Sequence, residues 1–334
     1  MKPVADEAGP CVDPVPCGFR SFDRQWIIPD NRVINRPNPT LWELRSERQV
    51  FLTAVDRTSP SAGPGCTFSG LVPDLDHYNG RGGRVYPLWS DAGASNPNIR
   101  PRMLKVLSER MQREVTADAL FSYIAAVAAH PGFTTRFKND LSMPGLRIPL
   151  AADRAIFEEA VELGRRVVWL HTFGERMANT AAGQPPGPPR LPPERAPFIP
   201  KEGAIPQDES GMPDSINYDP TLRRLHLGRG FIENVSPETW RYEVSGKQVL
   251  LQWFSYRRRN RERPIIGDRR PPSPLGDIQP EAWQAEYTSE LLNVLHVLTL
   301  LVDLEPKQAA LLEHICAGSI LTNDELVAAG AFEL

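Results

Sequence analysis

The sequence predicts an α+β fold, in which mixed sheet segments surround a helical hub and the C-terminal portion is helical. Two stretches, residues 118–130 and 153–171, have the apolar periodicity of buried helices. Several short apolar runs lie between Gly- and Pro-rich clusters, a pattern typical of strands. With 334 residues, 41% of them hydrophobic, the chain is long enough to bury a core in one large domain or two.

The hub consists of two helices joined by a stiff connection. Asp118 is a plausible N-cap for the first helix, and Pro131 is expected to end it. Asp153 is expected to cap the second helix, and the intervening MPGLRIPL contains two prolines. The apolar positions of the second helix are spaced along one face: Ile156, Phe157, Ala160, Val161, Gly164, Val167, Val168 and His171.

The other elements follow from shorter patterns. Strands are expected at residues 22–28, 47–55, 66–72, 85–89, 222–227 and 240–244. Further helices are expected at residues 101–115, 247–256, 279–303 and 305–316.

The chain is expected to divide at a proline-rich connector. Eight of the eighteen residues in 183–200 are proline, which favours an extended segment over a helix or a sheet. We therefore predict a disordered tail over residues 1–18 and a first half over 19–177. A linker over 178–216 and a second half over 217–334 complete the predicted organisation.

Composition excludes several classes of protein. The four cysteines, Cys11, Cys17, Cys66 and Cys316, lack zinc-site spacing and are expected to be reduced thiols of a cytoplasmic protein. The N-terminus has no apolar segment of the signal-peptide kind. The most apolar run, residues 291–304, is short and contains polar residues, so it predicts a core helix and no membrane association.

Positive charge is concentrated in parts of a chain whose net charge is −3. Residues 220–270 carry a surplus of seven positive charges, and the run after residue 256 is the densest part. Such clusters suit phosphate contacts, although a solvated basic face would have the same composition. The candidate phosphate contacts are Arg257, Arg258, Arg259, Arg261 and Arg263, together with Arg100, Arg102 and Lys105 of the helix expected at 101–115. Arg81 and Arg84 lie in the glycine-rich loop expected at residues 79–84 and are the candidates for reading base edges.

No catalytic constellation stands out. The sequence has no Asn/Asp-Pro-Pro-Tyr/Phe signature of an amino-methyltransferase, and no glycine-rich phosphate loop. Pro213-Asp214 and Glu305-Pro306-Lys307 match the letters of a nuclease motif, but the second part lies where a helix is expected to start and not on a strand. His130 and His171 lie on apolar faces, and the seven tryptophans lie mostly in apolar segments, so we predict that they are core residues.

Four pieces of the chain resemble the C-terminal specificity region of Type ISP restriction–modification enzymes. The first is FRSFDRQWII at residues 19–28, and the second is VYPLW at 85–89. The third runs from YIAAVAAHPGFTTRF at 123–137 through LRIPL to FEEAVELGRRVVWLH at 157–171. The fourth is WRYEVSGKQVLLQWFSYR at 240–257. The histidine and proline at 130 and 131 are adjacent, one residue closer than in the family pattern.

The resemblance implies a target-recognition domain that reads double-stranded DNA for a separate adenine methyltransferase/helicase-nuclease polypeptide. It also implies that S-adenosylmethionine, ATP and Mg²⁺ are held by those partner domains, with no cofactor, metal or catalytic residue in this chain. Two alternatives stay open. The chain could carry the adenine-specific methyltransferase activity itself, or it could be a non-enzymatic module that binds another protein.

Overall fold

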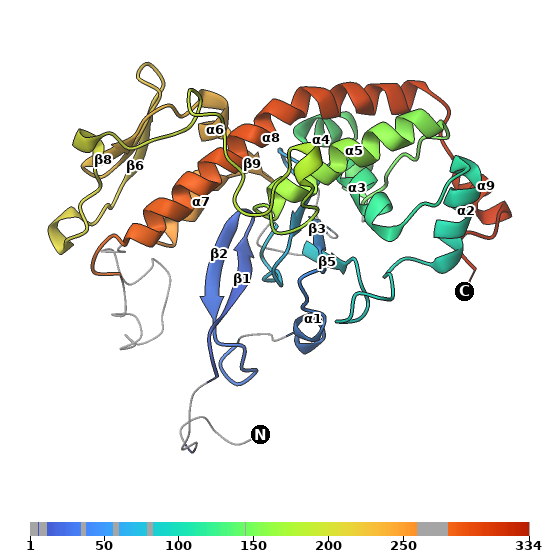
Figure 1. The fold of residues 1–334 in the computed structure, drawn as a ribbon, viewed down its shortest axis with the longest axis horizontal. Coiled ribbons are helices and arrows are strands. Elements are labelled where there is room, and N and C mark those ends of the chain that lie inside the picture. Colours follow the sequence, from blue (N-terminus) through green and yellow to red (C-terminus); the bar gives the residue numbers. More distant parts are fainter. Residues whose placement is uncertain are drawn as a thin grey trace. The chain divides into compact units, whose positions relative to one another are not determined.

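The computed structural model describes residue 6 and residues 12–34, 38–55, 60–78, 83–143, 145–258 and 280–333. The chain divides into two compact units. The first unit comprises residues 1–188, 244–246 and 304–334, and the second comprises residues 189–243 and 247–303. Helices and small antiparallel sheets make up both units, which confirms the α+β class (Figure 1).

The strands of the first unit form a hairpin and a three-stranded sheet. The hairpin pairs β1 (Val15–Arg20) with β2 (Asp23–Ile27). The sheet has the order β4-β3-β5, formed by β3 (Phe51–Val55), β4 (Cys66–Ser69) and β5 (Gly83–Pro87), and every residue of β3 is buried. The expected strands at 22–28, 47–55, 66–72 and 85–89 are therefore present with shifted or shorter bounds. Because β1 begins at Val15, the predicted tail over 1–18 is wrong for its last residues.

Three helices precede the long helix of the hub, after the short α1 (Pro39–Glu43). They are α2 (Pro101–Met111), α3 (Ala117–Ala128) and α4 (Pro131–Arg136). α2 ends earlier than predicted because Gln112 adopts a left-handed conformation with φ 51°. The cap of α3 is Thr116, whose hydroxyl accepts from the Ala119 N–H, and Asp118 lies in the first turn. The predicted cap at Asp118 is therefore wrong.

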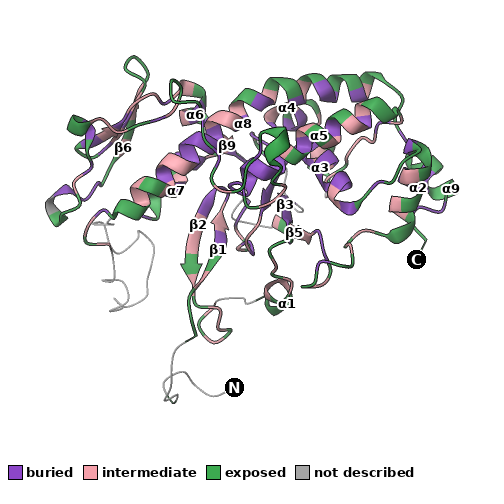
Figure 2. Cartoon of the chain, viewed as in Figure 1, coloured by how far each residue is buried: buried purple, intermediate pink, exposed green. Residues whose placement is uncertain are grey.

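The predicted hub is confirmed. Helix α5 (Arg154–His171) is capped by Asp153, whose carboxylate accepts from the Ile156 N–H at 3.0 Å. α5 packs along α3, and Figure 2 shows both helices with buried residues on their inner faces. The backbones approach so closely that a Cβ at Gly164 would lie 1.6 Å from the Ser122 carbonyl oxygen.

The connection between α3 and α5 is fixed by one side chain. The Tyr123 hydroxyl donates to the Pro149 carbonyl and accepts from the Ala151 N–H, both at 2.8 Å. A 3₁₀ turn, η2 (Asp140–Ser142), precedes this stretch, and Leu321 N–H donates to the Leu150 carbonyl. The C-terminal helix α9 (Asn323–Ala328) then begins with a capping box made by Thr322 and Glu325.

The proline-rich segment contains short turns. They are η3 (Thr180–Ala182), η4 (Lys201–Gly203) and η5 (Glu209–Gly211). The division between the two units falls between Pro188 and Pro189, inside the predicted linker. Leu191 in this segment is buried, and its N–H donates to His296 Nδ1 at 3.0 Å. Part of the predicted connector is therefore packed within the second unit.

The second unit contains a three-stranded sheet of order β6-β7-β8, built from β6 (Ile216–Asp219), β7 (Arg224–Leu227) and β8 (Gly230–Ile232). Next come α6 (Pro237–Arg241), the pair β9 (Glu243–Val244) and β10 (Lys247–Gln248), and α7 (Val249–Ser255). The strand expected at 240–244 is mostly wrong. Ser236 caps α6 and Pro237 occupies its first turn, so Trp240 and Arg241 are helical.

Helix α8 (Ala285–Ala317) is one continuous helix of 33 residues, so the two helices expected at 279–303 and 305–316 are wrong. Pro306 lies inside it and removes one backbone donor. Apolar residues are buried before the proline, at Leu301 and Leu304, and after it, at Leu311, Leu312 and Ile315. Burial on both sides offsets the lost hydrogen bond. α8 is long and apolar enough to cross a membrane, but half of its most apolar window is buried in the fold, as in a core helix.

Candidate nucleic-acid interface

Arg257 is a structural residue and not an exposed phosphate contact, which corrects the prediction made for it. Its side chain is 3% exposed and lies 2.9 Å from a carboxylate oxygen of Glu290. The guanidinium also stacks over the Trp253 ring, 3.8 Å from its centroid, and donates to the Trp253 carbonyl. These contacts join α7 to α8 within the second unit, so the guanidinium is unavailable to DNA.

Arg258 is the neighbouring residue and is exposed. Its N–H donates to the carbonyl of Phe254 in α7 at 3.1 Å, so its backbone is held by a helix whose Trp253 and Phe254 are almost fully covered. The remaining candidates of this run, Arg259, Arg261 and Arg263, lie outside the described residues, as does Arg81.

The three candidates near the start of α2 lie together. Arg100 is the residue before the helix, and Arg102 and Lys105 lie in its first turns, all exposed. Arg102 forms an ion pair with Glu333 at 2.7 Å, but the side chains are 53% and 62% exposed. Lys105 lies 3.9 Å from Glu109, also in solvent. Such exposed pairs contribute little stability, about 0–1 kcal/mol, so a phosphate could replace either carboxylate.

Arg84 lies apart from those three residues in the chain, on β5, opposite Ala54 of β3. Its side chain is exposed at the edge of the sheet. The described candidates therefore form three groups: the start of α2, the edge strand β5, and the end of α7 in the second unit.

A hollow beside α5 identifies a surface of the first unit that does not suit DNA. The hollow has a volume of about 650 Å³ and is lined by four glutamates, Glu114, Glu158, Glu159 and Glu162, against two arginines, Arg113 and Arg165. Hydrogen bonds from Arg154 and Arg113 lower the pKa of the Glu158 carboxyl, which keeps it ionised. An anionic hollow repels phosphate, so a DNA surface on this unit lies elsewhere.

Sequence reasoning missed two arginines of the second unit, one in the turn before β7 and one at the end of α6. Arg223 and Arg241 are exposed, whereas Arg224 pairs with Glu233 and stacks on Phe231. Arg223 has no carboxylate within ion-pair distance in the described part of the chain. The positive charges counted over residues 220–270 include these arginines, but the count does not show which of them are exposed.

His130 and His171 are core residues, as predicted, and His77 is buried as well. Burial, together with a smaller effect of nearby His77, lowers the pKa of His171 to about 3. The neutral imidazole accepts the Phe68 N–H at Nδ1 and packs edge-on against Phe22 and Phe68. Burial likewise lowers the pKa of His77 to about 4, and its Nδ1 contacts the Gly18 carbonyl at 2.9 Å. His130 is also buried.

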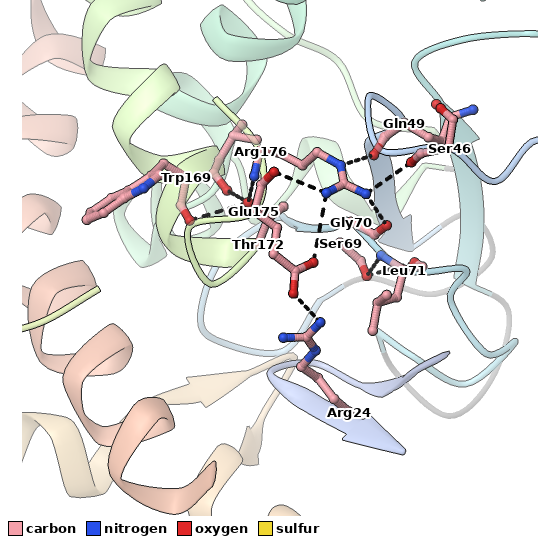
Figure 3. A network of polar contacts seen from close by, with 11 residues as sticks. Arg24, Ser46, Gln49, Ser69, Gly70, Leu71, Trp169, Thr172, Glu175 and Arg176 are labelled. Carbon is pink, nitrogen blue, oxygen red and sulfur yellow. Dashed lines mark hydrogen bonds and ion pairs between the residues drawn. The ribbon is translucent and has the colours of Figure 1, made fainter. Parts of the chain in front are cut away.

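One partly buried arginine that the sequence did not single out fixes the framework of the first unit (Figure 3). Arg176 follows α5 and donates to the carbonyls of Ser46, Gln49 and Gly70 at 2.9–3.1 Å. Next to it, Glu175 forms an ion pair with Arg24 of β2. The network joins the end of α5 to the sheet and to the hairpin, so it holds the first unit together and leaves its outer surfaces for binding.

Trp26 contradicts the prediction that the tryptophans are core residues. Its side chain is 71% exposed on β2, whereas Trp89, Trp169, Trp253 and Trp283 are buried. Ile28 and Val33, which follow it in the chain, are 45% and 56% exposed. A large aromatic side chain left in solvent beside other apolar residues is a feature of binding surfaces.

The fold is similar to that of three enzymes solved with DNA. A nuclease-deletion mutant of the Type ISP restriction-modification enzyme LlaGI, in complex with a DNA substrate mimic, matches with a TM-score of 0.60 and 14% identity over 93% of this chain. DrdV in its DNA complex matches with a TM-score of 0.62 and 15% identity over 91% of this chain. The ATP-dependent Type ISP enzyme LlaBIII bound to DNA matches with a TM-score of 0.62 and 12% identity over 94% of this chain.

The matched part is a fraction of each of those proteins, covering 25%, 28% and 19% of their chains. No curated protein matches the sequence. The family model of the Type ISP C-terminal specificity domain, however, matches residues 4–294. This match covers most of the 334 residues, and it includes all four pieces that resemble the family. The chain belongs to the family of Type ISP C-terminal specificity domains.

Proposed function

We propose that this chain recognises a double-stranded DNA target as the specificity part of a Type ISP restriction–modification system. The observation that carries the proposal is the family match over residues 4–294. The similarity in fold to three enzymes solved with DNA supports it. The same fold can serve different functions, so the binding surface must be argued from this chain's own residues.

Exposed cations supply the electrostatic part of the proposed interaction. Arg100, Arg102 and Lys105 at the start of α2, and Arg258 after α7, position the chain by contacting phosphates. Arg84 on β5 is a further contact at an exposed sheet edge. Because the chain as a whole has a net charge of −3, binding depends on these local groups and weakens steeply with salt.

The chemistry belongs, in this proposal, to a separate cytoplasmic polypeptide with adenine methyltransferase and helicase activities. S-adenosylmethionine, ATP and Mg²⁺ would be held there. The described residues of this chain include no group of three His, Cys, Asp or Glu side chains arranged for a metal ion.

The exposed apolar side chains on β2 and in the residues that follow it favour a second role, the docking of that polypeptide. Trp26, Ile28 and Val33 leave apolar area in solvent that a protein partner would cover. Trp26→Ser should weaken co-purification with the methyltransferase polypeptide. Leu75→Ser, a change at another exposed apolar residue (44% exposed), should not weaken it. If the two variants co-purify equally well with the methyltransferase polypeptide, Trp26 is not part of the docking surface.

A methyl-transfer assay tests the proposed division of labour. The chain alone, with S-adenosylmethionine and DNA, should yield no methyladenine, and the partner alone should yield none at a defined sequence. The two together should methylate one motif. Product from the purified chain alone would support the alternative in which this chain is itself the methyltransferase.

A further inference from the structure

The turn between β6 and β7, residues 219–223, carries an exposed leucine and an exposed arginine, and it is not among the phosphate contacts proposed above. It connects two antiparallel strands of the second unit and carries Leu222 and Arg223 next to one another in the chain. Leu222 is 54% exposed, and Arg223 is exposed as well. An exposed leucine alone is ordinary. Here it is adjacent to an exposed arginine, so one turn presents both an apolar and a cationic side chain.

The turn is rigid. The Asp219 carboxylate accepts from the N–H groups of Thr221 and Leu222 at 2.8 and 3.1 Å, and Pro220 restricts the backbone between them. Arg223 holds a left-handed conformation with φ 52°, uncommon for a residue with a side chain. The Arg223 carbonyl accepts from the Val235 N–H at 3.0 Å, which ties the turn to the chain beyond β8. A rigid turn loses little conformational freedom when it binds.

An aromatic pair and a second arginine lie beside the turn. Tyr218 stacks on Trp240 with ring centroids 5.6 Å apart, and its hydroxyl donates to the Val235 carbonyl. Burial raises the pKa of Tyr218, the charges of Arg223 and Arg241 oppose that rise, and the charges of Glu238 and Asp219 add to it. Arg241 directly follows Trp240 in the chain. Arg241 pairs with Glu238 only in solvent, where the two side chains are 69% and 56% exposed.

We infer that the β6–β7 turn is the part of this chain that enters a groove of the DNA, with Arg223 donating to base edges and Leu222 packing against bases. Arginine is the residue that most often reads guanine, through two parallel hydrogen bonds to O6 and N7. Leucine is among the apolar residues that proteins place against or between base steps. Arg241 contacts the adjacent phosphate, and the Tyr218–Trp240 pair supports the base of the turn. This inference rests on the proposed function, because it names the reading element of the same DNA surface.

Selection from a randomised duplex pool tests the inference with matched variants. Arg223→Ala should lower the preference for the favoured base at one position by roughly ten- to hundredfold. Arg223→Lys should keep the salt dependence but lose most of that preference, because an ammonium cannot form the two parallel bonds. Leu222→Ala should weaken binding at the same motif. Arg229→Ala is the control: it removes an exposed arginine from the turn at the opposite end of β7, and the selected motif should not change.

The outcomes separate this inference from the proposed function. A wild-type chain that selects no motif, alone or with its methyltransferase polypeptide, would contradict both. The wild-type chain could select a motif that the Arg223→Ala and Arg223→Lys variants also select, unchanged. That outcome would support the proposed function and contradict the role inferred for the turn. Thermal unfolding of each variant checks the fold. Arg223→Gly, which suits a left-handed position, should lose the same base preference even if Arg223→Ala unfolds.

Discussion

Two adjacent arginines illustrate at the residue scale how burial separates a structural role from a binding role. Arg257 is covered and engaged by Glu290 and Trp253, whereas Arg258 is exposed. The sequence places both in one basic run and cannot distinguish them. The distinction depends on the direction in which each side chain leaves the end of α7.

Arg257→Ala should lower the free energy of unfolding by about 2–4 kcal/mol, because it leaves Glu290 without its partner and removes the stacking on Trp253. Arg258→Ala should change it by less than about 0.5 kcal/mol, as is usual for an exposed side chain. Urea denaturation of the two variants gives the comparison. Similar losses for both would contradict the structural role assigned to Arg257.

The buried histidines predict a pH dependence of stability. The pKa values of His171 and His77 are lowered by burial to about 3 and about 4 in the folded chain, below the value of about 6.5 expected after unfolding. Between those pH values the unfolded chain binds more protons than the folded chain. The contribution of the two neutral histidines to the free energy of unfolding is therefore fully present above about pH 6.5 and is lost as the pH falls. Each histidine contributes a slope of at most about 1.4 kcal/mol per pH unit.

Denaturation in urea at several pH values between 7.5 and 5 measures this slope. His171→Gln keeps an acceptor for the Phe68 N–H but cannot be protonated, so its slope should be shallower than that of the wild type. Equal slopes for the two proteins would show that His171 is not buried in the neutral form.

Periodicity and caps predict the individual elements well where burial follows a regular pattern. The hub helix from Arg154 to His171 is the clearest case, because its cap at Asp153 and its buried positions both follow from the sequence. The prediction of a strand at 240–244 was wrong because Ser236 and Pro237 start a helix. These helix-start signals outweigh the alternation of apolar and polar residues that follows them. Pro306 was expected to separate two helices, but burial on both sides keeps α8 continuous.

The candidate site was less predictable than the fold. Charge counting found the basic segments, but it could not tell that Arg257 is covered, that Arg223 is exposed, or that Trp26 is left in solvent. Exposure depends on which elements pack together, and that information is not local in sequence.

The contact between α3 and α5 gives a prediction for these two elements. Gly164→Ala adds a methyl group where the Ser122 carbonyl lies, so the helices must separate. Although alanine is the better helix former, we expect a loss of about 1–3 kcal/mol or more from overpacking. Thermal unfolding can measure it, with Glu159→Ala on the exposed face of α5 as the control. A stabilised Gly164→Ala variant would contradict this close approach.

The uneven distribution of charge is the property of the whole molecule that matters most for the proposed function. Cations are exposed at the start of α2 and in the second unit, whereas the hollow beside α5 is lined by glutamates. This separation of charge lets a chain with a net charge of −3 bind a polyanion through selected surfaces.

Removing one phosphate contact should reduce the salt dependence of DNA binding without changing sequence preference. For Arg102→Ala, the slope of log K against log salt concentration should become shallower by roughly 1. Glu159→Ala, which removes a charge on α5, should leave the slope unchanged. A steeper slope, or a changed motif, for Arg102→Ala would argue against a phosphate contact at this residue.

The most direct test of DNA target recognition is binding of the purified chain to a randomised duplex pool. Fluorescence anisotropy at two salt concentrations would be followed by sequencing of the bound fraction, without and with the methyltransferase polypeptide. We predict binding that weakens with salt and an enriched asymmetric motif. The absence of binding at low salt, in both the chain alone and the combined proteins, would contradict the proposed function and would favour a module that binds only protein.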